Sequence, residues 1–242
     1  MCKIILSVVI LLLSLHDAHT QLTSADIDVI VLAQEWPVAV CLFYKHELHP
    51  GGGCYLPEQK NQWTIHGIWP RKLTGEYLEY CDEKWRFNPR NIKRIEGELK
   101  KAQIVVHKED APYVFWSHEW RKHGTCASLL EPFNTEHKYF SKSIEWNQKF
   151  AISDMLEAAN IFPDDTKYLD PMKVADAVKA KTGKDPMVGC YLIYGVPYLQ
   201  EVRICMDKNF NVMDCKLQVI DDWCLSSPKG VIYAASEWLP SS

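Results

Sequence analysis

The chain has 242 residues, enough for one large domain or two small ones, and 47% of them are hydrophobic, an ordinary fraction for a globular protein. Its formal net charge of −4 excludes a protein that binds nucleic acid through an overall excess of basic residues. Any polyanionic ligand must therefore be held locally, by a few residues.

The N-terminal segment predicts export rather than part of the fold. Lys3 precedes an apolar run over 4–15, and Ala18 and Thr20 stand where a signal peptidase cleaves. The run is too short for a spanning helix, although an anchored amphipathic segment is the alternative. We expect a signal peptide at 1–20 and a mature domain at 21–242. The sequence contains no second long apolar run, so we expect no membrane attachment of the mature form.

Hydrophobic patterning predicts the elements of the mature chain in order. Residues 27–44 predict a pair of strands broken at Trp36-Pro37, and residues 62–70 predict a further strand. Residues 88–103 predict a basic amphipathic helix, and residues 135–160 predict a long helix packed on one side.

A further helix is predicted to begin at Asp170-Pro171 and to end at Gly183. After it the pattern changes to β, with strands over 190–194, 202–205 and 216–220. Asn209 and Asn211 fit the turn between the last two. The economical prediction is one α+β domain, with a mainly antiparallel central sheet flanked by helices and stapled by disulfides.

Removal of the signal peptide with Cys2 leaves an even number of cysteines, which after an export signal predicts a complete set of disulfides in an oxidising compartment. Spacing alone leaves about 105 possible pairings. No two cysteines have Cys-x-x-Cys spacing, so metal binding by them is not predicted. The eight are Cys41, Cys54, Cys81, Cys126, Cys190, Cys205, Cys215 and Cys224.

The strand predicted over 62–70 contains a histidine in an unusual setting. His66 is expected on the face opposite Trp63 and Ile65. Gly67 permits close approach of the backbone, and Trp69 supplies a flat apolar surface. A single histidine in a strand is more often structural, so this segment alone leaves both interpretations open.

Residues 115–126 concentrate charged and aromatic side chains in one predicted helix. Glu119 and His123 are four residues apart and share a face, with Lys122 beside them. Gly124 is expected to end the helix as a C-terminal cap. An acid, a cation and an imidazole on one face are unusual for a structural helix, so we interpret the segment as a site.

The spacing of the histidines excludes the most similar metal motif. The helix of a zinc protease carries His-Glu-x-x-His, with histidines four residues apart on one face. His118 and His123 are five apart, about 140° from one another around a helix at about 100° per residue. We therefore expect no metal and no cofactor.

Two histidines, a carboxylate and an ammonium group suit phosphodiester cleavage without a metal. If His66 lies opposite His123, one imidazole can act as acid and the other as base in one turnover. Lys122 suits a phosphate oxygen, and Glu119 can orient or polarise an imidazole. Exposed aromatic rings, with Trp69 among them, suit stacking on nucleobases. The natural nucleophile is a neighbouring hydroxyl group, which indicates RNA.

Two segments resemble the active-site segments of the ribonuclease T2 family, which are secreted or lysosomal endoribonucleases with an α+β fold. They are His-Gly-Ile-Trp-Pro at 66–70 and His-Glu-Trp-Arg-Lys-His-Gly-Thr-Cys at 118–126. The resemblance extends to Gln-Glu-Trp-Pro at 34–37, to the cysteine layout and to the export signal. It therefore covers essentially the whole mature chain.

The resemblance implies the catalytic roles. His66 and His123 would be the catalytic pair, and Glu119 and Lys122 would stabilise the charged phosphorane-like state. The implied reaction is attack of the 2′-hydroxyl on phosphorus, which gives a 2′,3′-cyclic phosphate that is hydrolysed to a 3′-phosphate. We assign His123 as the base and His66 as the acid of the first step, a direction that the sequence leaves open.

Substrate contacts and disulfide pairings are also implied by the resemblance. His118 would contact phosphate, and Trp69 would stack on a base. Arg71 and Glu35 stand where an acidic residue and a glutamine are common in the family, so base preference does not transfer. The implied disulfides are Cys41–Cys54, Cys81–Cys126, Cys190–Cys224 and Cys205–Cys215.

The expected function is a metal-independent endoribonuclease that cleaves single-stranded RNA, spares DNA and acts as a monomer. The expected location is outside the cell or in the endolysosomal lumen, with an acidic pH optimum implied by the resemblance. The alternative is a secreted binding or signalling protein that has the same scaffold and acts without cleavage. The presence of all four residues of the implied catalytic set favours the enzyme.

Overall fold

The computed structural model describes residues 22–59, 61–215 and 220–237. Its central sheet is built around β1 (Val29–Glu35), which pairs antiparallel with β2 (Thr64–Arg71) on one side and β5 (Val196–Asp207) on the other. β5 also pairs antiparallel with β4 (Met187–Ile193). The short strands are β3 (Tyr168–Leu169), β6 (Val212–Met213) and β7 (Val231–Ile232).

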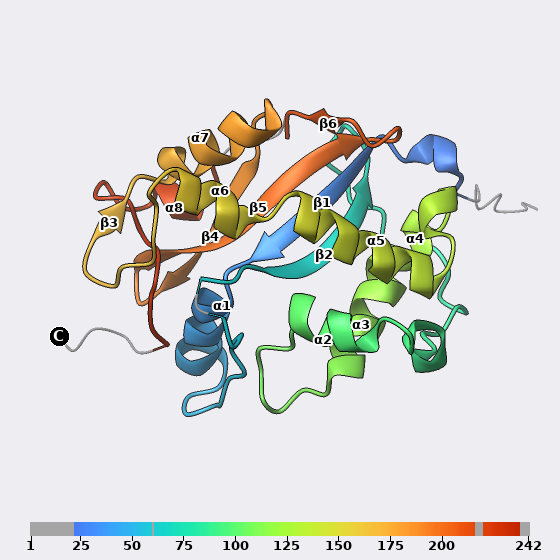
Figure 1. Ribbon diagram of the computed structural model, residues 1–242, viewed down its shortest axis with the longest axis horizontal. Coiled ribbons are helices and arrows are strands. Elements are labelled where there is room, and N and C mark those ends of the chain that lie inside the picture. Colours follow the sequence, from blue (N-terminus) through green and yellow to red (C-terminus); the bar gives the residue numbers. More distant parts are fainter. Residues whose placement is uncertain (1–21, 60, 216–219, 238–242) are drawn as a thin grey trace, which may run out of the picture.

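Among these paired strands the contact between β5 and β7 is parallel and the others are antiparallel. The prediction of a mainly antiparallel sheet is therefore confirmed. In Figure 1, α5 (Glu136–Lys149) and α6 (Ile152–Ala158) cross in front of this sheet. The other helices are α1 (Pro37–Phe43), α2 (Glu96–Ala102), α3 (Pro112–Glu119), α4 (Thr125–Ala127), α7 (Pro171–Thr182) and α8 (Asp222–Leu225).

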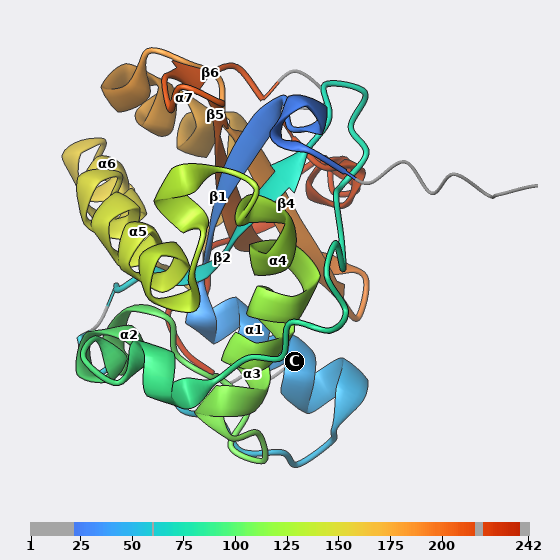
Figure 2. The ribbon, with the colours of Figure 1, turned by 90° about the vertical axis from the view of Figure 1, so that its right-hand side faces the viewer.

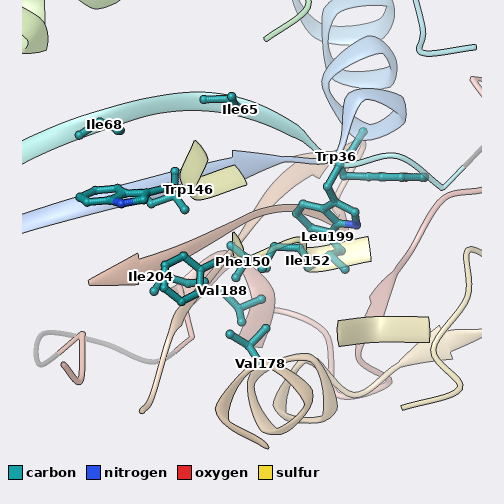
Figure 3. Close-up of a cluster of buried hydrophobic side chains, with 14 of the residues drawn as sticks. Trp36, Ile65, Ile68, Trp146, Phe150, Ile152, Val178, Val188, Leu199 and Ile204 are labelled. Carbon is teal, nitrogen blue, oxygen red and sulfur yellow. The ribbon is translucent and has the colours of Figure 1, made fainter. Parts of the chain in front are cut away.

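The main hydrophobic core lies between the sheet and the layer of α5, α6 and α7, and Figure 2 shows this layer from the side. Ile65 and Ile68 of β2 are buried in it together with Ile204 of β5 and Trp146 of α5 (Figure 3). Full burial of one such side chain stabilises the fold by about 1.5–3 kcal/mol. This core therefore holds β2 in a fixed position.

The second half of the predicted strand pair is a helix, so that prediction is wrong. α1 begins directly after Trp36, whose backbone is extended, and Pro37 occupies the first helical turn. Proline suits this position because its missing N–H would have no partner there. Residues 37–42 are all buried, and an apolar run without a polar face does not distinguish a helix from a strand.

The helix predicted over 135–160 is broken between α5 and α6, at Phe150. Gln34 lies at the break: its Nε2 donates to the Phe150 carbonyl at 2.7 Å, and its Oε1 accepts from the Ile152 N–H at 3.5 Å. This buried amide satisfies the backbone groups that the break leaves without helical partners. The segment 88–103 is also divided, into a 3₁₀ turn at Pro89–Ile92 and α2.

The predictions for the later elements are confirmed where the structure describes them. Asp170 caps α7 by accepting a hydrogen bond from the Met172 N–H at 2.9 Å, and Gly183 ends the helix with a φ of 73°. The strands predicted over 190–194 and 202–205 correspond to β4 and β5. The strand predicted over 216–220 falls largely on residues outside the described ranges, and so does the predicted signal peptide.

Disulfides connect four pairs of described cysteines, and the pairs are those that the family resemblance implies. Cys81–Cys126 joins the loop that follows β2 to the end of the helical segment 112–127, with its Cα atoms 4.9 Å apart. The remaining pairs are Cys41–Cys54, Cys190–Cys224 and Cys205–Cys215. In the described part of the chain, no helix combines the length and the apolar character needed to cross a membrane.

Candidate active site

A β-bulge in β2 sets the direction of His66. Ala33 of β1 lies opposite Gly67, and the next residue of β1, Gln34, lies opposite Ile65. His66 is therefore an extra residue without a partner on β1. Such a bulge reverses the alternation of side chains beyond it and often re-aims a side chain near an active site.

The bulge explains how residues three apart share a face of this strand. Ile65 and Ile68 are both buried in the main core. His66 and Trp69 both line a cleft elsewhere on the strand. The prediction that His66 lies on the face opposite Ile65 is thus confirmed, and the bulge adds Trp69 to the same face as His66.

Side chains from other elements satisfy the backbone around the bulge. Gln103 Nε2 donates to the His66 carbonyl at 2.7 Å, and Tyr139 Oη donates to the Ile68 carbonyl at 2.9 Å. The Gln103 carbonyl accepts from Nε1 of Trp116 at 3.1 Å. Since buried backbone groups need partners, these contacts link the bulge to α3 and α5.

The helical segment of the site runs without interruption from α3 through a π-helical turn, η4 (Trp120–Gly124), into α4. Gly124 has helical angles, φ −61° and ψ −39°, so the prediction that it caps the helix is wrong. A Cβ atom on Gly124 would lie 2.3 Å from Cε3 of Trp120. Glycine is needed here because the buried Trp120 ring packs against the backbone of the turn.

The site residues lie around a cleft of about 270 Å³ between β2, β5 and the α3–η4 segment. All six residues predicted to act in catalysis or substrate binding line it. The six residues that the sequence predicted to form one site therefore do lie around one cleft. The lining residues are His66, Trp69, His118, Glu119, Lys122 and His123, joined by Tyr77, Glu79 and Arg203.

Trp69 contacts the imidazoles of His66 and His123 and one carboxylate. Its ring centroid lies 4.9 Å from that of His66 and 5.3 Å from that of His123. Its Nε1 donates to Oε2 of Glu119 at 3.0 Å. The prediction that the Trp69 ring is exposed is wrong, because the residue is only 6% exposed, and its stacking on a base stays a prediction. Its contacts hold the three groups in position relative to one another.

Gly67 allows the carboxylate to approach the strand. A Cβ atom at this position would lie 2.1 Å from Oε2 of Glu119 and 2.5 Å from Nε1 of Trp69. No side chain fits without displacing these atoms. The prediction that Gly67 permits a close approach of the backbone is therefore confirmed.

Carboxylates surround His66. Its Nδ1 lies 2.6 Å from Oε2 of Glu201 and 3.6 Å from Oε2 of Glu35. Burial lowers the pKa of the imidazole, but the charges of Glu35 and Glu201 outweigh burial and raise the pKa to about 10. His66 is therefore protonated at acidic and neutral pH.

His123 has the opposite environment. The residue is buried, and among the described residues its Nδ1 has no hydrogen-bond partner. Burial lowers the pKa of this imidazole, and the positive charges of Lys122 and His66 add to the effect, so that the pKa is about 2. His123 is therefore neutral at acidic and neutral pH.

The remaining site groups differ in exposure. Burial raises the pKa of Glu119, which favours its protonated form. Lys122 is partly exposed, with its Nζ 3.4 Å from Oε1 of Glu79. His118 is exposed, and partial burial together with the charge of Lys122 lowers its pKa. Lys122 and His118 thus offer a cation and a neutral imidazole at the mouth of the cleft.

The sequence interpretation missed the charged residues of β5. Glu201 and Arg203 are two residues apart and share a face of the strand, and Arg203 Nε donates to Oε1 of Glu201. Two charges at this spacing in a largely buried strand are the signal that could have found them. Glu35, noted only as a departure from a family pattern, lies directly opposite Glu201.

Arg71, the other departure from that pattern, lies outside the cleft. Its Nη2 donates to the Gly75 carbonyl at 3.0 Å, and its guanidinium lies 4.7 Å from the centre of the Tyr77 ring. Tyr77 lines the cleft. Arg71 therefore packs against a residue of the cleft without lining the cleft itself.

Among the described residues, Cys41, Cys54 and Glu237 form a cluster of possible metal ligands. Both cysteines are joined in a disulfide, and a metal binds the thiolate form of cysteine. This cluster is therefore not assigned as a metal site.

Comparison with known proteins places the chain in a family. The model of the Ribonuclease T2 family matches residues 27–215. Ribonuclease Oy of Magallana gigas is 32% identical over 206 residues, which cover 82% of this chain and 92% of that protein. Ribonuclease T2 of Danio rerio is 33% identical over 202 residues, which cover 82% of this chain and 77% of that protein.

Solved structures agree with the sequence comparison. A mutant of RNase MC1 in complex with 5′-UMP has a TM-score of 0.70 at 27% identity, covering 86% of this chain and 99% of that one. RNase NT in complex with 5′-AMP has a TM-score of 0.67 at 26% identity, covering 78% of this chain and 91% of that one. Human RNase T2 has a TM-score of 0.65 at 27% identity, covering 78% and 90%. With sequence, fold and cleft in agreement, the chain belongs to the ribonuclease T2 family.

Proposed function

We propose that this protein is an endoribonuclease that cleaves single-stranded RNA without a metal, by transphosphorylation. The observation that carries the proposal is one cleft that holds two imidazoles in opposite surroundings, His66 beside two carboxylates and His123 buried without a hydrogen-bond partner for Nδ1 among the described residues. One is held protonated by carboxylates and the other is held neutral by burial and cations. Concerted cleavage needs an acid that is protonated and a base that is unprotonated at the same pH.

In the first step His123 is the base and His66 is the acid. His123 takes the proton of the 2′-hydroxyl, the 2′-oxygen attacks phosphorus, and the bond from phosphorus to the 5′-oxygen breaks. His66 gives its proton to that leaving oxygen. The products are a 2′,3′-cyclic phosphate and a fragment with a free 5′-hydroxyl. The opposite pKa shifts support this direction, which the sequence left open.

In the second step the two histidines exchange roles. His66, now neutral, takes a proton from water as the water oxygen attacks phosphorus. The bond to the 2′-oxygen breaks, and His123 returns its proton to that oxygen. The product is a 3′-phosphate, and both imidazoles regain their starting charge.

The other groups of the cleft stabilise the pentacoordinate phosphorus. Lys122 supplies positive charge to its oxygens, and the exposed His118 contacts a phosphate oxygen. Glu119 is fixed by Trp69, and burial favours its protonated form. In that form it donates a hydrogen bond to a phosphoryl oxygen.

A second cavity suits a nucleobase better than the buried Trp69 does. It has a volume of about 340 Å³, shares His66 and His118 with the cleft, and is lined by Phe115 and Tyr191. Aromatic rings beside a phosphate site suit the unstacked bases of a single strand. The complexes of RNase NT with 5′-AMP and of an RNase MC1 mutant with 5′-UMP support nucleotide binding by this chain.

We also propose that residues 1–20 are a signal peptide and that residues 21–242 form the catalytic domain, which acts as a monomer. Four disulfides suit an oxidising compartment. Extracellular ribonuclease LE of Solanum lycopersicum, 27% identical over 215 residues, supports an exported protein. The proposed destination is the cell exterior or the endolysosomal lumen.

The test is incubation of the purified protein with single-stranded RNA and with DNA of the same sequence, with and without EDTA. The expected result is cleavage of RNA in both conditions, first to 2′,3′-cyclic phosphates and then to 3′-phosphates, with the DNA intact. Loss of cleavage on chelation would contradict the metal-free mechanism. RNA binding without cleavage would favour the alternative, a binding or signalling protein on this scaffold.

A further inference from the structure

Two buried glutamates face one another across the sheet beside His66. Glu35 of β1 is paired with Glu201 of β5, and the two residues are 5% and 1% exposed. Like charges in directly opposite positions destabilise a sheet, and burial of an unpaired carboxylate costs more. The arrangement therefore requires compensating positive charge.

Arg203 and His66 supply that charge to Glu201 through its two oxygens. Oε1 of Glu201 accepts a hydrogen bond from Nε of Arg203, and Oε2 lies 2.6 Å from Nδ1 of His66. Arg203 is itself held in place, with Nη1 3.4 Å from Oη of Tyr77 and its guanidinium 5.3 Å from the centre of the Trp69 ring. The three groups form a continuous row, Arg203–Glu201–His66.

The two glutamates are not equivalent. Burial raises the pKa of Glu35 to about 7. Burial acts on Glu201 in the same direction, but Arg203 and His66 outweigh it and lower the pKa to about 2. At acidic pH, Glu35 is protonated and Glu201 is ionised. Among the described residues, Glu201 is also the carboxylate within hydrogen-bond distance of the His66 ring.

We propose that Glu201 is a positioning residue: held by Arg203, its carboxylate accepts a hydrogen bond from Nδ1–H of His66 and leaves Nε2 as the nitrogen that exchanges protons with substrate. The inference rests on the proposed function, because it concerns the acid of that reaction. It explains both steps. With a proton on Nε2, His66 is the acid of cleavage, and after that proton leaves, the bond to Glu201 keeps the tautomer whose bare Nε2 accepts a proton from water.

Other titratable and charged groups also face His66, and their effect on its pKa must stay constant in a test of Glu201. A change at Glu201 leaves all of these groups in place. The set comprises Glu35 on β1, Arg203 on β5, His118 and Glu119 on α3, and Lys122 and His123 on η4.

The test compares Glu201→Gln with Glu35→Gln, two changes of the same kind on opposite sides of one imidazole. The readouts are NMR titration of the His66 ring and the pH profile of kcat/KM on a dinucleotide. Loss of a charge at hydrogen-bond distance is expected to lower the His66 pKa by about 1–3 units. In Glu201→Gln the loss of the His66 proton is expected to add a fall in kcat/KM at the pH of the lowered His66 pKa, and kcat falls more than KM changes. Glu35→Gln produces a smaller shift.

Glu201→Asp and Glu136→Gln are the controls. Glu201→Asp keeps the charge and is expected to restore most of the His66 pKa. Glu136 is a buried glutamate outside the cleft that accepts from Nδ2 of Asn91 at 3.0 Å, so Glu136→Gln leaves the titration and the rate profile unchanged. Thermal unfolding of each variant separates a local effect from loss of the fold.

Two outcomes would overturn the inference. One is an unchanged His66 titration in folded Glu201→Gln, even with reduced activity, because the glutamate would then be structural. The other is an equal or larger shift in Glu35→Gln. The NMR readout needs no substrate, so a wild-type protein that does not cleave RNA contradicts the proposed function while the Glu201–His66 contact is still tested.

Discussion

The imidazoles of His66 and His123 contact the same tryptophan ring, yet their surroundings have opposite charge. His66 stands on a strand whose neighbours bring Glu35 and Glu201 to its Nδ1. His123 stands on a helical turn, buried next to the cation of Lys122. Both groups are histidines, so residue type is not what separates the proposed acid from the proposed base. The elements packed around each imidazole separate them: sheet carboxylates for one, and burial with a cation for the other.

Removal of either imidazole gives the largest expected effect. His66→Ala and His123→Ala should each lower kcat/KM by about 10²–10⁴-fold, the range for loss of a general acid or base. A substrate with a p-nitrophenolate leaving group separates the two roles, because this group departs without a proton. We expect such a substrate to restore much of the rate of His66→Ala and little of the rate of His123→Ala.

The reverse pattern of rescue would exchange the two roles. His46→Ala and His137→Ala are the matched controls, since neither residue lines the cleft, and both should retain nearly the full rate. Equal losses in all four variants would indicate folding defects rather than chemistry, which thermal unfolding would reveal.

Gly67→Ala tests whether the close contact between β2 and the α3–η4 segment is needed for activity, as the two imidazoles are expected to be. The added Cβ would lie 2.1 Å from Oε2 of Glu119, so the carboxylate and the Trp69 ring must move. We expect a loss of kcat/KM and, from overpacking, a decrease of about 1–3 kcal/mol in the free energy of unfolding. Urea unfolding and steady-state kinetics measure the two effects.

Gly97→Ala is the matched control for this variant. Gly97 lies in α2, and a Cβ there would meet nothing within 4 Å. Alanine in a helix is more stable than glycine by about 0.5–1 kcal/mol, so Gly97→Ala should gain stability at unchanged kcat/KM. Similar behaviour of the two variants would show that the approach at Gly67 is not required.

The pH dependence of kcat/KM also tests the difference between His66 and His123. A lowered pKa of the base His123 keeps it neutral at acidic pH, and a raised pKa of the acid His66 keeps it protonated above neutrality. Neither imidazole therefore limits the rate between these values. Burial raises the pKa of Glu119 and raises that of Glu35 to about 7. Of these two carboxyl groups, Glu119 is the proposed hydrogen-bond donor to the phosphoryl oxygen, so kcat/KM should be highest on the acidic side and fall as Glu119 loses its proton.

Glu119→Gln is the variant that tests this assignment. It removes the ionisation, so its rate should be lower but nearly constant through the range in which the wild-type rate falls. The measurement is kcat/KM on a dinucleotide at constant ionic strength. A wild-type rate that climbs steadily from acidic to mildly alkaline pH would contradict the proposed role of protonated Glu119.

The part of the site that could be predicted from sequence is the part encoded locally. His66 and Gly67 are adjacent, and Glu119, Lys122 and His123 are placed by helical spacing alone. The predicted grouping of these residues agrees with the structure because a single strand and a single helical segment contain them all. The burial of Trp69 was not predictable, because it depends on how that strand and that helix pack together.

What sequence could not give is the register between strands. The carboxylate of Glu201 reaches His66 because β1 and β2 pair with a bulge and β5 lies on the other side of β1. Contacts over 135 residues of sequence leave no periodic pattern. The break at Phe150 is similar, since it depends on the amide of Gln34 rather than on a helix-breaking residue.

The smallest expected effect concerns the surface ion pair at the mouth of the cleft. Nζ of Lys122 lies 3.4 Å from Glu79, and both side chains are partly exposed, so the pair contributes about 0.2–1 kcal/mol. Glu79→Gln frees Lys122 for phosphate, and kcat/KM should rise by at most about fivefold, the factor that corresponds to 1 kcal/mol. Glu76→Gln, which breaks the exposed Lys72–Glu76 pair elsewhere, makes the same change in net charge and should have less effect. A lower kcat/KM in Glu79→Gln alone would mean that Glu79 orients Lys122 toward the substrate rather than competing with it.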